Sequence, residues 1–217
     1  MFTNIAIDGP AGAGKSTIAK LVAKKKGFIY VDTGAMYRAI AYYTLEKGIE
    51  ADDTEGIADC IKDIVVDIRY IDEQQRVFID DKDVTPYLRA EETGNRASAI
   101  AKLGVVRNKL TDLQRFIAAN NNVVMDGRDI GTTVLPNANV KVYLTASSAV
   151  RAKRRYDELQ AQNIVADISI IEADIIARDE ADMSRKISPL KKADDAILVD
   201  SSEMTINEVV DAIIDLI

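Results

Sequence analysis

Apolar residues recur along the chain in short runs of strand length, separated by longer stretches with helical spacing. The runs lie at residues 4–8, 28–32, 122–126, 140–144 and 196–200. Between them, apolar positions return every three or four residues, as on the buried face of an α-helix. Strands that alternate with helices predict a parallel sheet, because each parallel connection needs a crossover long enough to hold a helix. We therefore expect an α/β fold with a doubly wound, five-stranded parallel sheet.

Residues 65–87 interrupt this alternation. Alternating apolar and polar positions predict three short strands, at 65–70, 76–79 and 82–84, joined by polar turns at 71–75 and 80–81. Such a pattern indicates a small antiparallel sheet inserted between the second and third core strands. The insertion either extends the wall of a substrate site or has no functional part.

The last residues of the chain predict a structural helix. Thr205 and Glu208 have the spacing of a capping box, and the apolar residues that follow them share one face. These apolar residues are Ile206, Val209, Val210, Ile213, Ile214 and Ile217.

Length and charge limit the classes of function. The 217 residues suffice for one sizeable core, and a net charge of −7 argues against a nucleic-acid polymer as partner. No apolar run has the length of a membrane span and no signal peptide opens the chain. No heptad pattern is present either. We expect a cytoplasmic monomer.

Histidine is absent and cysteine is rare in this chain, and this limits the possible chemistry. The chain has no histidine, which removes histidine acid–base catalysis and most zinc sites. Its one cysteine, Cys60, lies on the apolar face of a predicted helix with Ile57, Ile61 and Ile64, so we expect a buried thiol and not a nucleophile. Phosphoryl transfer tolerates the lack of histidine, because positioning and charge neutralisation do most of its work.

A phosphate-binding loop follows the first strand. Residues 9–17 match the pattern G-x-x-x-x-G-K-[ST], with a strand before them and helical spacing after them. In this pattern the backbone N–H groups and the helix N-terminus surround phosphate oxygens, Lys15 reaches the outer phosphates, and Ser16 holds Mg²⁺. The residues expected to bind ATP are Gly9, Pro10, Ala11, Gly12, Ala13, Gly14, Lys15, Ser16 and Thr17.

Four of the predicted strands end in aspartate: Asp8, Asp32, Asp126 and Asp200. Ligands of such sheets bind beyond the carboxyl ends of the strands, which places Asp32 and Asp126 where a site should be. Asp8 and Asp200 fit a simpler role, in which each caps the turn or helix that follows it.

Arginines form three clusters outside the phosphate-binding loop. Arg38 follows the second strand, and Arg128 follows the third between Gly127 and Gly131, two glycines that could supply unusual backbone angles. The third cluster is helical, with Arg151, Arg154 and Arg155 on one face and Arg178, Asp182 and Arg185 on another. A guanidinium binds phosphate bidentately and keeps its charge, which suits a phosphorylated acceptor. The simpler alternatives are a solvated face pairing Arg154 and Arg155 with Asp157 and Glu158, and a surface ion-pair ladder around Asp182.

These motifs together resemble the bacterial cytidylate kinase family. The resemblance is carried by GPAGAGKST at 9–17, DTGAMYRA at 32–39, DGRDIGT at 126–132, RDEADMSR at 178–185 and SPLKKADDAILVDSS at 188–202. It implies transfer of the γ-phosphoryl group of ATP to CMP or dCMP, with Mg²⁺. It also implies one P-loop kinase domain over residues 1–217, with an acceptor-nucleotide insertion at about 35–115 and a short, mobile helical lid at about 151–165.

The resemblance assigns roles to individual residues. It implies that the CMP phosphate is held by Thr33, Arg38, Arg128 and Arg185. Ser98, Arg107 and Asp129 would face the cytosine. Arg178 and Asp182 would approach the ribose, and Arg154 and Arg155 would belong to the lid. Catalysis would depend on Lys15, Arg128, Arg154, Arg155 and Arg185.

The chemistry of Asp129 agrees with its implied role, since a carboxylate accepts from the cytosine amino group, where uracil has an oxygen. Two positions depart from other family members: Thr33 replaces a serine, and Ser16 a glycine, so that Thr17 is an alternative magnesium-side hydroxyl. Other readings are a P-loop kinase for UMP, AMP or shikimate, or a nucleotide-binding module without catalysis. The GTPase signature Asn-Lys-x-Asp is missing, because Leu110 and Thr111 follow Asn108-Lys109.

Overall fold

The computed structural model describes residues 2–72 and 74–217, which form two compact units. Unit 1 comprises Met1–Tyr30 and Asn120–Ile217, and unit 2 comprises Val31–Ala119. Two positions of the expected domain, residues 1 and 73, lie outside the described residues, and residue 73 belongs to the turn expected at 71–75.

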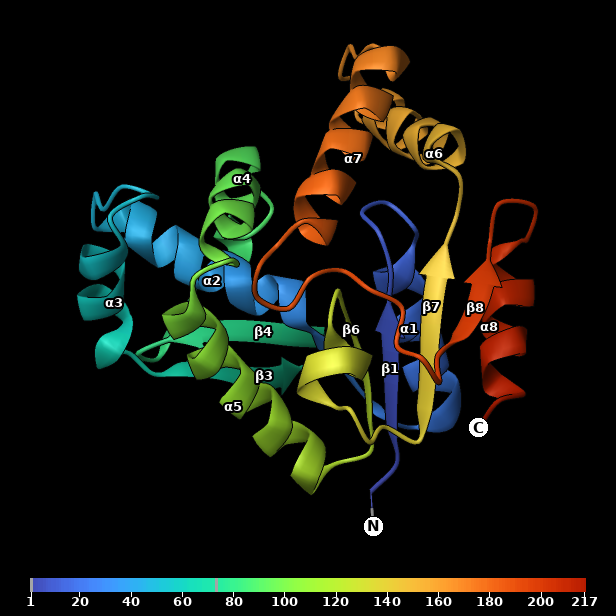
Figure 1. Ribbon diagram of the computed structural model, residues 1–217, viewed down its shortest axis with the longest axis horizontal. Coiled ribbons are helices and arrows are strands. Elements are labelled where there is room, and N and C mark those ends of the chain that lie inside the picture. The colour runs from blue at the N-terminus through green and yellow to red at the C-terminus, as the bar shows by residue number, and fades with distance from the viewer. Residues whose placement is uncertain (1, 73) are drawn as a thin grey trace. The chain divides into compact units, whose positions relative to one another are not determined.

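Unit 1 is built on a five-stranded sheet in the order β2-β6-β1-β7-β8 (Figure 1). The strands are β1 (Asn4–Asp8), β2 (Ile29–Asp32), β6 (Val123–Gly127), β7 (Val140–Thr145) and β8 (Ile197–Asp200). β1 pairs in parallel with β6 and β7, and β7 pairs in parallel with β8. All five strands lie within a residue of the apolar runs that predicted them, and the expected α/β fold with a five-stranded sheet is confirmed.

Helices surround this sheet within unit 1. They are α1 (Lys15–Lys26), the π-helical turn η2 (Ile130–Val134), α6 (Ser148–Ala161), α7 (Ile168–Met183) and α8 (Ile206–Ile214). Figure 1 shows the turn between β1 and α1, and the pair α6–α7, beyond the carboxyl ends of β1 and β7. The capping box of α8 is confirmed, but Ile206 is exposed and Ile217 lies beyond the helix, so the buried face is shorter than expected.

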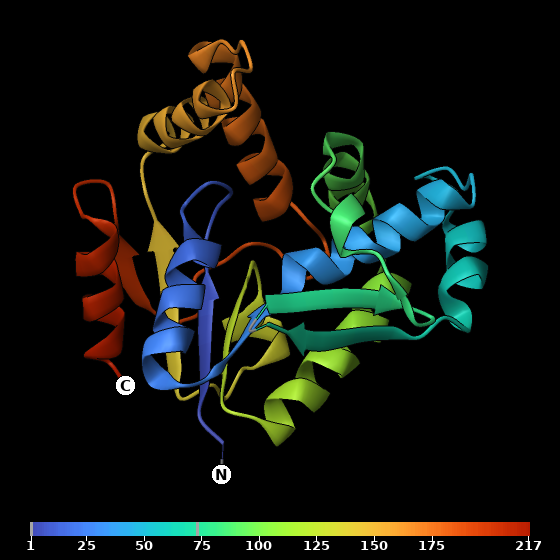
Figure 2. The ribbon, with the colours of Figure 1, turned by 180° about the vertical axis from the view of Figure 1, so that it is seen from behind.

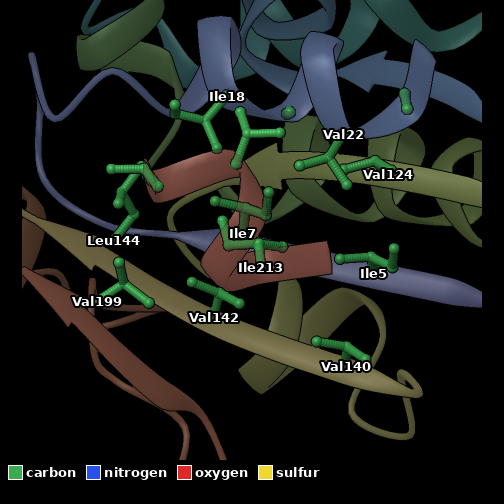
Figure 3. Packing of buried hydrophobic residues seen from close by; sticks show 14 residues of the cluster. Ile5, Ile7, Ile18, Val22, Val124, Val140, Val142, Leu144, Val199 and Ile213 are labelled. Atoms are coloured by element: carbon green, nitrogen blue, oxygen red, sulfur yellow. The ribbon is translucent and has the colours of Figure 1, made fainter. Parts of the chain in front are cut away.

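The core of unit 1 lies between β1, β7, α1 and α8 (Figure 3). Ile5 and Ile7 of β1 point toward Ile18 and Val22 of α1, and Ile213 of α8 closes the cluster. Each such side chain contributes about 1.5–3 kcal/mol when it is fully buried. This packing fixes α1 against the sheet and so positions the loop that joins β1 to α1.

Unit 2 contains helices and a three-stranded antiparallel sheet. The helices are α2 (Thr33–Glu46), α3 (Thr54–Lys62), the 3₁₀ turn η1 (Thr85–Tyr87), α4 (Glu91–Ile100) and α5 (Gly104–Asn120). The strands are β3 (Val66–Ile71), β4 (Gln74–Ile79) and β5 (Lys82–Asp83), and Figure 2 shows β3 and β4 side by side. The inserted sheet is confirmed. The expected turn at 71–75 is too long, because Ile71 pairs with Gln74 and extends the hairpin despite its polar sequence.

Cys60 is half-buried on α3, so the expectation of a buried thiol is wrong in degree, although Ile57 and Ile61 beside it are buried. Partial burial raises the pKa of this thiol, which does not favour a nucleophile.

Among the described residues, no helix combines the length and the apolar character needed to cross a membrane.

Candidate functional site

The loop between β1 and α1 depends on glycine at three positions. A side chain at Gly9 would place its Cβ 1.9 Å from the carbonyl oxygen of Leu144, so β7 packs directly against the loop. Gly12 and Gly14 have φ angles of 74° and 84°, which other residues rarely adopt. Gly14 is also the N-cap of α1. The loop therefore leads its backbone to a helix N-terminus, where N–H groups and the helix dipole favour an anion.

Lys15 is buried at the start of α1. Its Nζ donates to the carbonyl oxygen of Pro10 at 2.6 Å, within the same loop. Burial lowers its pKa well below the usual value, and the positive charge of Arg128 lowers it further. A phosphate group in the loop would supply the negative charge that favours the ammonium form.

Ser16 and Asp126 bring a hydroxyl and a carboxylate together beside the loop. Ser16 Oγ donates to Asp126 Oδ2 at 2.9 Å, and Tyr30 Oη donates to Asp126 Oδ1 at 2.9 Å. Asp126 thus lies near the carboxyl end of β6, as its position at the end of the apolar run 122–126 predicted. Both groups offer the oxygen ligands that Mg²⁺ prefers. Among the described residues, no group of three or more His, Cys, Asp or Glu side chains is arranged to hold a metal ion.

Asp182 on α7 holds two arginines from different segments. Arg128 Nε donates to Asp182 Oδ2 at 2.8 Å, and Arg185 Nη2 donates to Asp182 Oδ1. The Asp182 side chain is only 2% exposed. The alternative of a surface ion-pair ladder is therefore wrong, and Arg178, the third member of that ladder, is exposed. The ion pairs concentrate two positive charges near one buried carboxylate.

Asp8 does not cap the segment that follows it, contrary to expectation. Its carboxylate accepts from the backbone N–H groups of Ile130 and Gly131, at 2.8 and 2.7 Å. Asp200 does behave as expected, because it accepts from the N–H of Ser202. Asp129, just before Ile130, is buried and is the N-cap of η2.

The two glycines near Arg128 also differ from expectation. Gly127 is the last residue of β6 and pairs with Asp8, and Gly131 has an ordinary φ. A Cβ at 131 would fit tightly, because it would lie 3.2 Å from Lys141 Cδ and 3.4 Å from Asp8 Oδ2.

Arg151 and Asp179 connect α6 and α7 to the phosphate-binding loop. Arg151 Nη1 donates to Asp179 Oδ2 at 2.6 Å and to the carbonyl oxygen of Ala11 at 2.8 Å. The N–H of Ala11 donates to Asp179 Oδ1 at 3.1 Å. Both side chains are buried. Neither residue was predicted to belong to the site, and the only signal in the sequence was the position of Arg151 in an arginine cluster.

The three arginines of α6 share one helical face, as expected, but their surroundings differ. Arg151 is buried, whereas Arg154 donates to the carbonyl oxygen of Ser201 at 2.8 Å. Arg155 is exposed and pairs with Glu158 at 3.2 Å. Asp157 pairs with Lys153, so only half of the alternative solvated-face pairing is found. Arg155 is the one of the three whose charge faces water.

The remaining predicted residues belong to unit 2. Asp32 caps α2 by accepting from the N–H of Ala35 at 2.8 Å, and it pairs with Arg38 at 3.2 Å. Thr33 is buried and Ser98 half-buried. Arg107 is buried, donates to the carbonyl oxygen of Ala101 at 3.0 Å, and lies over the ring of Tyr37.

Comparisons with known proteins show which family the chain resembles. The profile of the family described as "Cytidylate kinase" matches residues 5–217. A cytidylate kinase of Ligilactobacillus salivarius is 49% identical, with 98% of this chain and 95% of the relative covered. One from Geobacillus sp. (strain WCH70) is 46% identical over the same shares. A solved structure of an uncharacterized Eubacterium ventriosum protein has a TM-score of 0.56 and 12% identity, covering 98% of this chain and 96% of that one, which concerns the fold alone.

Proposed function

The chain belongs to the cytidylate kinase family, and from that premise we propose that it transfers the γ-phosphoryl group of ATP to CMP or dCMP. Activity as a nucleoside monophosphate kinase follows from membership of the family. The observation that carries the proposal is Asp182, whose buried carboxylate holds Arg128 and Arg185. A second arginine group in addition to the phosphate-binding loop suits a reaction with two phosphorylated substrates.

In the proposed reaction, a phosphate oxygen of CMP attacks the γ-phosphorus of ATP. The bond from that phosphorus to the β–γ bridging oxygen breaks, and the products are CDP and ADP. The attacking oxygen is already anionic in the ionised phosphate, so the reaction needs no catalytic base. Lys15, the loop N–H groups and the arginines Arg128, Arg154, Arg155 and Arg185 neutralise the charge that spreads over the phosphoryl oxygens.

We propose Ser16 and Asp126 as the residues on the magnesium side of ATP. Mg²⁺ would join the phosphate oxygens and offset their charge. The hydrogen bond from Ser16 to Asp126 supports Ser16 over Thr17, because Ser16 already directs its hydroxyl at a carboxylate. In the absence of the ion, this hydrogen bond keeps both groups partnered.

The acceptor site is proposed from the roles that the family implies. Its phosphate residues are Thr33, Arg38, Arg128 and Arg185; its cytosine residues are Ser98, Arg107 and Asp129; and Arg178 and Asp182 serve the ribose. The buried carboxylate of Asp129 supports the assignment for cytosine over uracil, because cytosine presents an amino donor where uracil has an oxygen. We also propose that the protein is a cytoplasmic monomer and that no nucleic-acid polymer is its partner.

The experiment that tests this function is a coupled assay of ADP release. The purified chain is mixed with ATP and Mg²⁺, and CMP, dCMP, UMP, AMP and shikimate are compared as acceptors. We expect rapid release with CMP and dCMP and much slower release with the others. A preference for UMP, AMP or shikimate would contradict the proposed acceptor. Release independent of any added acceptor would mean that the phosphoryl group goes to water, and would contradict the kinase reaction.

A further inference from the structure

Asp8 stands directly before the phosphate-binding loop, yet its side chain serves a segment 122 residues away. Its two carboxylate oxygens accept from Ile130 N and Gly131 N, the first backbone donors after Asp129. We propose that Asp8 is a positioning residue for base recognition: it fixes the backbone that carries Asp129 and so sets the choice between CMP and UMP. This inference rests on the proposed function, in which Asp129 accepts from the cytosine amino group.

The arrangement requires a carboxylate at position 8. Two N–H donors need two acceptors, and Asp8 is only 5% exposed, so water does not replace a lost bond. An asparagine keeps one acceptor oxygen and turns an NH₂ group toward the second N–H. That donor would remain buried without an acceptor, which costs more than the loss of an exposed hydrogen bond.

The same segment is tightly packed at Gly131. A Cβ there would lie 3.2 Å from Lys141 Cδ and 3.4 Å from Asp8 Oδ2. The carbonyl oxygen of Asp129 accepts from Thr133 N at 2.8 Å and from Val134 N at 3.2 Å. The main chain of Asp129 is thus held by η2 after it, and η2 is held by Asp8. A shift of the two amides must move Asp129 with them.

Arg128, on the other side of Asp129, has its own anchor. Its Nε donates to Asp182, and its Nη1 donates to the carbonyl oxygen of Gly127. Loss of the Asp8 contact should therefore move Asp129 more than the guanidinium of Arg128. Recognition of the base should change more than recognition of the phosphate. This difference separates a positioning role from a general role in folding.

The test compares two variants that disturb the contact from opposite sides. Asp8→Asn removes an acceptor, and Gly131→Ala inserts a methyl group while Asp8 stays intact. Asp53→Asn is the control, because Asp53 also accepts from a glycine N–H, that of Gly56 at 2.8 Å, but is exposed and belongs to no proposed site. ADP release is measured with CMP and with UMP at saturating ATP and pH 8, and thermal unfolding is followed for every variant.

We expect the ratio of kcat/KM for CMP to kcat/KM for UMP to fall about tenfold or more in Asp8→Asn and Gly131→Ala. The change should lie mainly in KM for CMP, with KM for ATP unchanged, and Asp53→Asn should retain the wild-type ratio. Asp129→Ala gives the ratio without the base-recognising carboxylate, and the two variants should approach it.

An unchanged ratio in a variant that is less stable or less active would overturn the inference, because a merely structural role lowers both substrates alike. If Asp8→Asn does not fold, Gly131→Ala decides the question. If Asp129→Ala keeps the wild-type ratio while CMP remains the acceptor, the inference fails and the proposed function stands. If the wild type releases no ADP with CMP, both fail.

Discussion

At the scale of single residues, the side chain of Lys15 contacts its own loop, whereas its proposed role is to contact phosphate. Its ammonium is buried and bonded to Pro10 of its own loop. We expect Lys15→Ala to lower kcat at least tenfold, because a charge-assisted contact with phosphate contributes about 1.5–3 kcal/mol and strengthens as charge develops. The measurement is ADP release at saturating CMP and ATP. Unchanged unfolding in urea serves as the control, and near-normal turnover would remove the lysine from the mechanism.

The same scale shows where sequence reasoning ends. Asp8 and Asp200 both close apolar strands, and nothing local distinguishes them. Asp200 bonds to Ser202, two residues on, whereas Asp8 bonds to Ile130 and Gly131. The second pairing depends on β1 lying beside β6, which is a property of the folded sheet. Motifs placed Asp126 and Arg128 at the ligand end, but their side-chain partners Ser16 and Asp182 come from segments far along the chain.

At the scale of elements, α6 is anchored near its N-terminus, and its later residues are more exposed. Arg151 is tied to Ala11 and Asp179, so we expect any closing motion of the lid to begin beyond Arg151. The predicted lid at 151–165 is part of a longer helical pair, α6 and α7, which together span residues 148–183. The loop from Gln162 to Asp167 joins them, and its Val165 is 96% exposed.

We expect replacement of Arg154 and Arg155 by alanine to lower kcat far more than it raises KM for CMP. Arg155 contacts only an exposed glutamate, a pair worth about 0–1 kcal/mol, so its charge is available to a phosphoryl group at little cost. Steady-state kinetics with CMP provide the measurement. Lys153→Ala is the matched control, since Lys153 lies on the same helix in an exposed pair with Asp157. A change in KM alone would mean that the two arginines bind the ground state.

The regular elements were the more predictable part of the fold. Strands appeared as apolar runs because both faces of the sheet are covered, and the capping box of α8 marked its start. The hairpin of β3 and β4 was predicted too short, because Ile71 and Gln74 pair through backbone groups that every residue possesses. The division at Tyr30 and Val31 falls inside β2, where composition does not change.

At the scale of the whole molecule, Asp8 couples the free energy of unfolding to pH. Burial raises its pKa from 3.8 to about 6, although two backbone hydrogen bonds and the charge of Lys15 oppose the shift. The folded state therefore binds the proton more tightly than the unfolded state, and the contribution of Asp8 to stability falls as pH rises toward and through 6. At about 1.4 kcal/mol per pKa unit, the loss amounts to about 3 kcal/mol.

The measurement is urea unfolding of the wild type and of Asp8→Asn between pH 4.5 and 8. We expect the stability of the wild type relative to the variant to decrease across this range. The charged or titratable groups that act on Asp8 or pack beside it are Lys15, Asp129, Tyr143 and Lys141. A difference that stays constant with pH would show that Asp8 does not titrate in this window.

The hydrogen bond from Tyr30 to Asp126 has a consequence for the optical behaviour of the protein. The chain has eight tyrosines and no tryptophan, so its ultraviolet emission comes from phenol rings alone. An excited phenol is more acidic than one in the ground state, and a carboxylate that accepts its proton quenches its light. The fluorescence of Tyr30 should therefore be quenched while it donates to Asp126 at 2.9 Å. Any ligand that turns this carboxylate away should increase the fluorescence of Tyr30, so that binding at the site can be followed without a label.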